Sequence, residues 1–180
     1  PLSNVENSCF VCHREKLTDL VSDVYERQRK VKEGTSKLQK LLAKAHVEAA
    51  KAWELGATEA QMKEIQQGIR HAQWRWDYAA ASHGAAFHAP LETNRIVTSA
   101  TLIIQEARIE LTRLLHALGH DGPVDMPDFS DKAALQAFVG IDIEKDRYDK
   151  ERFLEEIVPR WMKEGREREA RMEVSTAVPE

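Results

Sequence analysis

An apolar repeat of seven residues near the start of the chain constrains the fold most. It runs through Leu17, Val24, Val31, Leu38, Ala45 and Ala52, with Leu20, Leu41 and Leu55 on the adjacent line. Apolar residues at this spacing lie on one face of an α-helix, so the pattern predicts a single long helix over roughly residues 15–55. Gly56 is expected to end this helix, because glycine readily adopts the left-handed conformation that closes a helix.

A second helix is expected directly after Gly56. Thr58 and Gln61 form a capping-box pattern, in which each side chain satisfies a free backbone donor at a helix start. An apolar stripe with three-and-four spacing follows, made of Met62, Ile65, Ile69, Ala72, Trp76, Ala79 and His83. Pro90 disfavours helical geometry at the residue before it, so this helix is expected to end or bend near His88.

A third apolar stripe predicts a helix from about Glu92 to Leu118, with Gly119 as its stop. Its expected inward-facing residues are Ile96, Ala100, Ile103, Ala107, Leu111, Leu114 and Leu118. Residues 121–128 are rich in proline, glycine and aspartate and are expected to form a loop.

Further helices are expected in the last part of the chain. Ser130 is predicted to cap a short helix, and a final helix is predicted from about Ile143, with a kink at Pro159. The charged tail beyond Lys163 is expected to fray. The helices expected in the first part are much longer than the mean of about 11 to 12 residues. They are expected to leave an apolar stripe for a second subunit, which favours dimerisation.

The two cysteines of the chain, Cys9 and Cys12, lie three positions apart and are followed directly by His13. The pattern C-x-x-C-H is the attachment signature of a c-type haem, whose porphyrin forms thioethers with both thiols while the histidine ligates iron. A redox dithiol usually accompanies a βαβ pattern, and a structural zinc needs two further ligands at comparable spacing. Neither accompanies the motif here, although these roles and coincidence remain alternatives.

The expected fold class is therefore all-α, with long antiparallel helices after a c-type haem-attachment segment. We expect three regions: residues 1–16 carrying the haem, 17–119 forming a helical hairpin and third helix for dimerisation, and 120–180 forming a loop and C-terminal helices. A formal net charge of −4 argues against a nucleic-acid surface. No apolar run approaches the roughly 20 residues of a membrane span.

The second axial ligand of a haem on His13 would separate electron transfer from catalysis: two strong-field ligands favour electron transfer, and an open or water-filled position favours a reaction centre. His83 is in register with an apolar stripe and is expected to be a core histidine. His88 lies five residues later, about 140° around the helix, at the break that Pro90 imposes, where a side chain can approach a neighbouring haem. Surface or cap positions are expected for His71, His116 and His120, and core or surface positions for Met62, Met126, Met162 and Met172.

Several longer segments are specific enough to indicate a family. They are "GATEAQM" at 56–62, "IRHAQWRWD" at 69–77, "ASHG" at 81–84 and "HAP" at 88–90. With the C-x-x-C-H motif, their order and spacing closely resemble the C-terminal part of the catalytic subunit of the ammonia-forming pentahaem cytochrome c nitrite reductases. The resemblance extends to about Arg166.

This resemblance implies that Cys9, Cys12 and His13 carry the last of five haems. It also implies that His88 is the distal iron ligand of the preceding haem, and that the distal ligand of the haem on His13 comes from another part of the protein. These are bis-histidine relay haems in the family, and the long helices form its homodimer contact. The expected location is the periplasm.

One departure from the family is large. Its catalytic haem belongs to a C-x-x-C-K motif, which the 180 residues lack, so no residue here is expected to be catalytic. The calcium site of the family is likewise expected outside this chain. Because a c-type haem is attached on the oxidising side of a membrane and the chain begins at Pro1, we expect a processed or partial chain.

The resemblance implies a six-electron reduction of nitrite to ammonium. The electron donor would be a membrane multihaem quinol dehydrogenase or a soluble multihaem cytochrome. Two alternatives stay open. The chain could be a self-contained monohaem electron-transfer protein with His13 and His88 on one iron, or a helical dimerisation module without haem.

Overall fold

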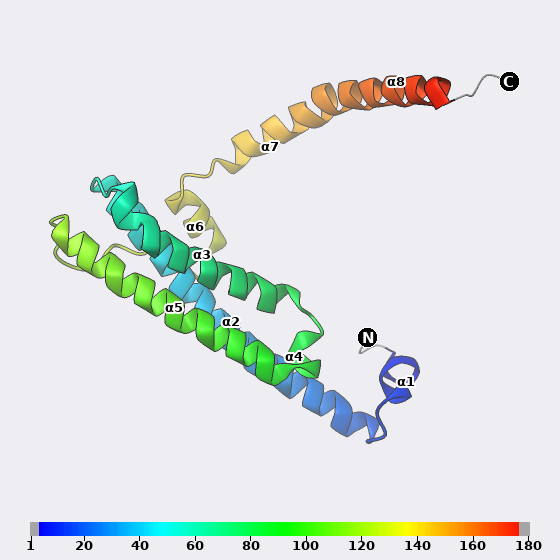
Figure 1. Ribbon diagram of the computed structural model, residues 1–180, viewed down its shortest axis with the longest axis horizontal. Coiled ribbons are helices and arrows are strands. Elements are labelled where there is room, and N and C mark those ends of the chain that lie inside the picture. Colours follow the sequence, from blue (N-terminus) through cyan, green and yellow to red (C-terminus); the bar gives the residue numbers. More distant parts are fainter. Residues whose placement is uncertain (1–3, 177–180) are drawn as a thin grey trace. The chain divides into compact units, whose positions relative to one another are not determined.

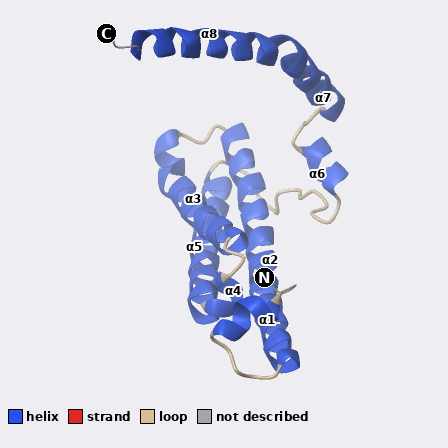
Figure 2. Cartoon of the chain, turned by 90° about the vertical axis from the view of Figure 1, so that its right-hand side faces the viewer, coloured by secondary structure: helices blue, strands red, loops and turns tan. Residues whose placement is uncertain are grey.

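The computed structural model describes residues 4–176, and these form helices joined by turns and loops (Figure 1). The α-helices are α1 (Val5–Ser8), α2 (Leu17–Glu54), α3 (Glu59–Ala81), α4 (Ala85–His88), α5 (Pro90–Ala117), α6 (Lys132–Phe138), α7 (Ile143–Arg152) and α8 (Val158–Thr176). A 3₁₀-helix spans Cys9–Val11 and a π-helix spans Phe153–Ile157. No strand occurs among the described residues (Figure 2), so the predicted all-α class is confirmed.

The chain forms two compact units, residues 1–126 and 127–180. The first contains the C-x-x-C-H motif, His88 and the three long helices α2, α3 and α5. The second contains α6 to α8. None of the helices in residues 4–176 has a stretch long and apolar enough to cross a membrane.

Helix α2 follows the seven-residue repeat that predicted it. Every member of the repeat after Leu17 is buried, whereas Leu17 is 42% exposed as the first residue of the helix. Gly56, with a φ of +89°, follows the helix as expected. The Thr58 capping box is also present: the Thr58 N–H donates to Gln61 Oε1 (2.8 Å) and the Gln61 N–H donates to Thr58 Oγ1 (3.3 Å).

The core of the first unit lies among α2, α3 and α5, which run side by side in both views of the molecule (Figures 1 and 2). Its largest fully buried apolar side chains are Leu38, Met62, Ile104 and Leu111. Small residues allow the helices to approach closely. A Cβ added to Gly68 would lie 3.2 Å from Ala107 Cβ, and one added to Gly34 would lie 3.2 Å from Val97 Cγ1.

The second helix ends earlier than its apolar stripe predicted. Helix α3 stops at Ala81, and a turn leads to the separate short helix α4. His83 lies in this turn and is exposed, so its expected role as a core histidine is wrong. The apolar stripe predicted a buried His83 only if the helix continued past Ala81, and it does not.

The buried line of α5 is shifted from the predicted one. Ala100, Ala107 and Leu111 are buried as expected, but the other buried positions are Thr93, Val97, Ile104 and Leu115. The predicted residues Ile96, Ile103, Leu114 and Leu118 are only partly buried. Helix α5 packs against both α2 and α3. Its buried face is therefore wider than one apolar stripe, and the middle of that face is displaced around the helix from the predicted row of residues.

Two predictions for the second unit are wrong: the residue that caps its first helix and the fraying of its last helix. Asp131, not Ser130, caps α6: its carboxylate accepts from the N–H groups of Ala133 (2.9 Å) and Ala134 (3.3 Å). Asp128 instead accepts from both the N–H and the hydroxyl of Ser130. The predicted fraying beyond Lys163 is wrong, because α8 continues to Thr176.

The π-helix precedes Pro159, where the sequence predicted a kink. Proline provides no N–H for the helical hydrogen-bond ladder. A π-helix is rare and occurs mostly as a single turn within an α-helix, as it does here. Figure 2 shows the helix bending where α7 passes into α8.

Candidate haem-binding site

The C-x-x-C-H motif folds into a single tight turn. The N–H groups of Cys12 (3.1 Å) and His13 (2.9 Å) both donate to the carbonyl oxygen of Cys9. Both cysteines are free thiols; Cys9 is partly buried and Cys12 is exposed. The turn therefore keeps two accessible sulfur atoms and one imidazole within five consecutive residues.

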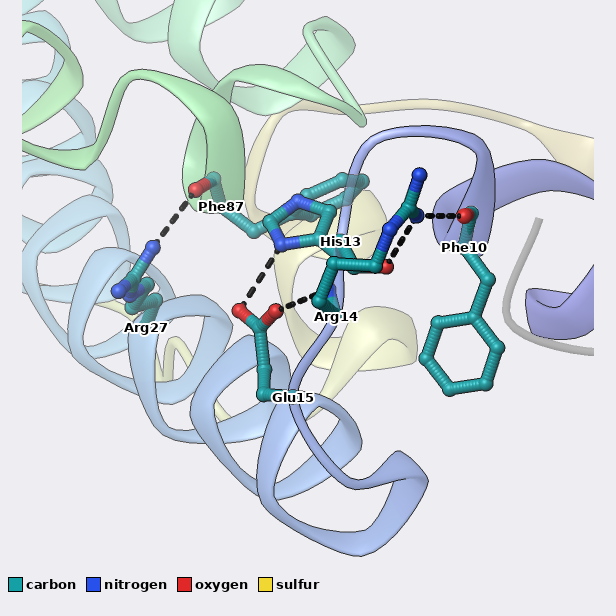
Figure 3. Close-up of polar contacts among 6 residues, drawn as sticks. All are labelled: Phe10, His13, Arg14, Glu15, Arg27 and Phe87. Carbon is teal, nitrogen blue, oxygen red and sulfur yellow. Dashed lines mark hydrogen bonds and ion pairs between the residues drawn. The ribbon is translucent and has the colours of Figure 1, made fainter.

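The side chain of Arg14 stabilises this turn by donating to its backbone carbonyls. Its Nη1 donates to the carbonyl oxygens of Phe10 and His13, the latter at 2.8 Å (Figure 3). Its Nη2 donates to the carbonyl of Val11 at 3.3 Å. A guanidinium offers several donors in one rigid plane, so a single side chain can satisfy carbonyls from successive residues.

Glu15 binds the imidazole of His13. Its Oε1 lies 2.9 Å from His13 Nδ1, and its Oε2 accepts from the Arg14 N–H at 2.8 Å (Figure 3). The carboxylate of Glu15 accepts hydrogen bonds from its own backbone N–H, from His13 and from the Arg14 N–H. These contacts lower the pKa of Glu15 to about 2. The side chain of His13 remains 39% exposed, with Nδ1 engaged by Glu15.

His88 is presented by a second, separate turn. It is the last residue of α4, its side chain is exposed, and the Phe87 ring packs against it with ring centroids 4.6 Å apart. Ala89 has φ −133° and ψ 53°, and Pro90 begins α5. The residue before a proline avoids helical geometry, so Pro90 separates α4 from α5.

Two side chains from the long helices fix this turn. The Thr93 hydroxyl, on a residue that is only 2% exposed, lies within hydrogen-bond distance of the carbonyls of Ala89 (3.0 Å) and Ala85 (3.2 Å). Arg27 of α2 donates through Nη1 to the carbonyl of Phe87 (3.1 Å; Figure 3). The backbone that carries His88 is therefore attached to both α2 and α5.

Removing the Thr93 hydroxyl is expected to loosen the His88 turn. Thr93→Val keeps the side-chain shape but removes the hydroxyl from the Ala85 and Ala89 carbonyls, which then keep only their backbone donors, the N–H groups of Ala89 (2.9 Å) and Thr93 (3.0 Å). Loss of one such hydrogen bond costs about 0.5–1.5 kcal/mol. The control is Thr112→Val on the same helix, whose exposed hydroxyl donates to the Arg108 carbonyl. We expect urea unfolding to show a clear loss for the first variant and little change for the second. Equal stabilities would contradict this role of Thr93.

The two turns emerge at the same end of the first unit. The motif leads directly into α2 at Leu17, and Arg27, which contacts the His88 turn, lies ten residues further along that helix. Ten helical residues correspond to about 15 Å. His13 and His88 thus belong to distinct turns that share the first part of α2 as their support.

The remaining histidines occupy more peripheral positions. His46 and His71 are exposed. His116 is also exposed, and its Nδ1 lies 2.7 Å from Asp121 Oδ1. His120 follows Gly119, which ends α5 with a φ of +85°, and its Nε2 is buried without a hydrogen-bond partner.

Methionines occupy both core and surface positions. Met62 is fully buried in the core as expected, Met126 is partly buried, and Met162 and Met172 are exposed. Within residues 4–176, no group of three or more histidine, cysteine, aspartate or glutamate side chains gathers as a metal site.

Four residues of the site were not identified from the sequence: Arg14, Glu15, Arg27 and Thr93. Arg14 and Glu15 directly follow the motif, a position that could have indicated them. Arg27 resembled the other charges on the surface of α2. Thr93 lies three residues after Pro90, where a hydroxyl can reach back to the preceding carbonyls, yet the apolar stripe of α5 gave no indication of it.

The donor set fits a covalently attached haem. Cys9 and Cys12 are not joined in a disulfide and are at least partly exposed. Glu15 occupies Nδ1 of His13, so Nε2 is the ring nitrogen available to iron. The all-helical fold and this turn define a helical segment of a c-type cytochrome.

The chain matches the cytochrome c552 family over residues 1–171 and therefore belongs to it, as its resemblance to the ammonia-forming cytochrome c nitrite reductases predicted. It is 49% identical over 167 residues to cytochrome c-552 of Parabacteroides distasonis, covering 93% of this chain and 34% of the relative. It is 46% identical to the cytochrome c-552 proteins of Porphyromonas gingivalis (92% and 33%) and Bacteroides fragilis (92% and 34%). The chain thus spans about a third of the length of these curated relatives.

Proposed function

We propose that this chain is the C-terminal part of a dissimilatory nitrite reductase that forms ammonium. In this proposal it carries one bis-histidine relay haem, provides the distal ligand of a neighbouring haem, and contributes the dimer contact. The observation that carries the proposal is the turn at residues 9–13, in which two free thiols accompany an imidazole whose Nδ1 alone is engaged. Membership of the cytochrome c552 family supports it.

Each residue of the turn has a defined task in this proposal. Cys9 and Cys12 form the thioethers, and His13 provides Nε2 as the proximal ligand. When bound, the haem supplies a one-electron iron couple. Arg14 keeps the turn closed through its three carbonyl contacts, so both thiols and the imidazole are presented together.

His88 has the corresponding task for the neighbouring haem. It is proposed as the distal iron ligand, and its exposure at the end of α4 leaves the imidazole accessible. Thr93 and Arg27 bind the backbone on both sides of it. Such anchoring lowers the entropy that the ligand loses on coordination. No residue of this chain is assigned to the chemistry on nitrite.

The remaining elements of the proposal concern the whole protein. We expect five haems and a calcium ion in it, with only one haem attached to this chain. Nitrite is the proposed substrate, and the proposed electron donor is a membrane multihaem quinol dehydrogenase or a soluble multihaem cytochrome. The proposed location is the periplasm, where c-type haem attachment takes place.

The proposal is tested by the intact mass of the native polypeptide together with its visible spectrum and its reduction of nitrite. We expect a chain much heavier than 20.5 kDa that carries five covalent haems and produces ammonium. A mass equal to this sequence plus one haem, without nitrite reduction, would replace the proposal with a self-contained electron-transfer protein. A colourless protein would leave only a helical module.

The homodimer contact is proposed on the outer face of α5. Leu102 and Ile109 are 57% and 51% exposed and lie seven residues apart, and therefore on one face of the helix. Leu102→Glu combined with Ile109→Glu is expected to convert the dimer to a monomer, because four carboxylates would be buried at a two-fold contact. Light scattering measures the change.

Tyr148→Glu is the control for the dimer contact, since Tyr148 is 59% exposed on α7, outside the long helices. It is expected to leave the mass of the native particle unchanged. A dimer that persists in the double variant would place the contact on another face.

A further inference from the structure

Among the described residues, Glu15 is the one acidic side chain within hydrogen-bond distance of the His13 imidazole. Its Oε1 lies 2.9 Å from His13 Nδ1, and its other oxygen is held by the Arg14 N–H at 2.8 Å. The carboxylate is thus fixed at both oxygens, and its position relative to the ring does not depend on one flexible contact.

This hydrogen bond determines which nitrogen of His13 can bind a metal. An ionised carboxylate only accepts hydrogen bonds, so the proton between the two groups belongs to Nδ1. The other ring nitrogen, Nε2, then presents its lone pair. A ligating histidine usually makes this second-shell bond to a carbonyl, a water or a carboxylate, and the bond sets both its tautomer and its orientation.

A carboxylate affects the ligand more strongly than a carbonyl does. A hydrogen bond to an ionised acceptor is roughly twice as strong as one between neutral groups, and it raises the basicity of the ligating ring. A more basic imidazole donates more charge to iron and stabilises the oxidised state over the reduced one. Second-shell hydrogen bonding is one of the means by which a protein sets a haem potential.

The adjacent arginine does not cancel this effect by pairing with Glu15. The guanidinium of Arg14 donates to the carbonyls of Phe10, Val11 and His13. The contact of Arg14 with Glu15 is made by the backbone N–H of Arg14 (Figure 3). The two residues after the motif therefore have separate tasks, in which Arg14 shapes the turn and Glu15 acts on the imidazole.

We propose that Glu15 is a positioning residue of the haem site: it directs His13 Nε2 to the iron and lowers the reduction potential of the haem held by Cys9 and Cys12. The inference rests on the proposed haem attachment. It adds a residue outside the C-x-x-C-H motif that sets the driving force of one relay step.

The test compares three variants of the haem-loaded protein. Glu15→Gln removes the charge but keeps an oxygen that can accept from Nδ1–H, whereas Glu15→Ala removes both. Glu6→Gln is the matched control, because it also removes one negative charge from the segment around the motif, where Glu6 is an exposed residue of α1. Potentiometric titration followed by electron paramagnetic resonance measures the potential.

The signal of this haem is assigned as the one that is absent from a Cys9→Ser, Cys12→Ser double variant. For Glu15→Gln we expect the reduced-to-oxidised ratio of this haem, at the wild-type midpoint, to rise about tenfold, equivalent to about 59 mV for one electron. Glu15→Ala is expected to give at least this shift, and Glu6→Gln less than a twofold change.

Two results would overturn the inference. Equal shifts in Glu15→Gln and Glu6→Gln would mean that only the net charge matters, and an unchanged potential in Glu15→Ala would mean that the hydrogen bond has no influence on the iron. Failure of haem attachment is distinguishable from both, because the wild-type intact mass would then show no haem on Cys9 and Cys12. A chain with one haem and no nitrite reduction would contradict the proposed function, whereas the potential of that haem would still test Glu15.

Discussion

Replacing His88, the proposed distal ligand, with alanine is expected to leave one haem of the native protein with a single imidazole ligand. Loss of one of two imidazoles changes a low-spin iron into a high-spin iron with an open or water-filled position. The visible and electron paramagnetic resonance spectra of the oxidised protein should therefore gain a high-spin component. The covalent haem content is expected to stay unchanged, since Cys9 and Cys12 are intact.

His83→Ala is a closely matched control for this experiment. His83 is also an exposed histidine, five residues earlier in the segment between α3 and α5. It lacks the backbone anchoring that Thr93 and Arg27 give the His88 turn. We expect its spectra to match those of the unmodified protein. A low-spin spectrum in His88→Ala, or a high-spin component in both variants, would remove His88 from the ligand set.

The same variant separates the two ways in which His88 could serve as a ligand. If His88 completes a neighbouring haem, the potential of the haem on His13 changes little in His88→Ala. If both imidazoles bind one iron, the haem on Cys9 and Cys12 itself becomes high spin. The signal that disappears in the Cys9→Ser, Cys12→Ser variant identifies which haem has changed.

The parts of the fold that could be predicted are those that local pattern determines. Leu38, Ala45 and Ala52 are buried because a seven-residue repeat must face a partner, whichever partner it is. The Thr58 capping box depends only on residues three apart. In the same way, C-x-x-C-H identifies its chemistry without any knowledge of tertiary structure.

The predictions were wrong where the structure depends on more than the local sequence pattern. Helix α5 lies against two helices, so the centre of its buried face could not be read from one stripe of apolar residues. His83 continued a helical pattern, yet the chain leaves the helix two residues earlier. Ser130 and Asp131 are both good caps, and their order in the turn, with Asp128 accepting from Ser130, selects Asp131.

Contacts between distant residues were the hardest part of the site to predict. Arg27 binds a carbonyl sixty residues away, and nothing in the charge pattern of α2 distinguishes it from its neighbours. The same separation joins Glu48 to Arg108. Both pairs link α2 to the α4–α5 segment, and both exist only because the helices pack with one particular register.

Glu48 and Arg108 form the most buried ion pair of the described residues. Arg108 Nε and Nη2 donate to the two carboxylate oxygens of Glu48 at 2.8 and 2.5 Å, and the side chains are 27% and 10% exposed for arginine and glutamate. The hydrogen bonds that Arg108 donates to the Glu48 carboxylate raise the pKa of Arg108. A bidentate pair of this kind fixes the register between α2 and α5 as well as their separation.

Arg108→Met is expected to destabilise the protein by about 3 kcal/mol, because it leaves a buried carboxylate without its partner. Glu48→Met combined with Arg108→Met is expected to recover most of this loss, since replacing both members of a buried pair by apolar residues is often neutral. Urea unfolding of the single and double variants measures the two free energies of unfolding.

Arg113→Met provides the comparison for the buried pair. Arg113 pairs with Glu110 on the surface of the same helix, with both side chains more than half exposed. Such a pair contributes at most about 1 kcal/mol, so this variant is expected to be nearly as stable as the unmodified protein. If the double variant were as unstable as Arg108→Met alone, the cost would come from lost packing between α2 and α5 and not from the unpaired charge of Glu48.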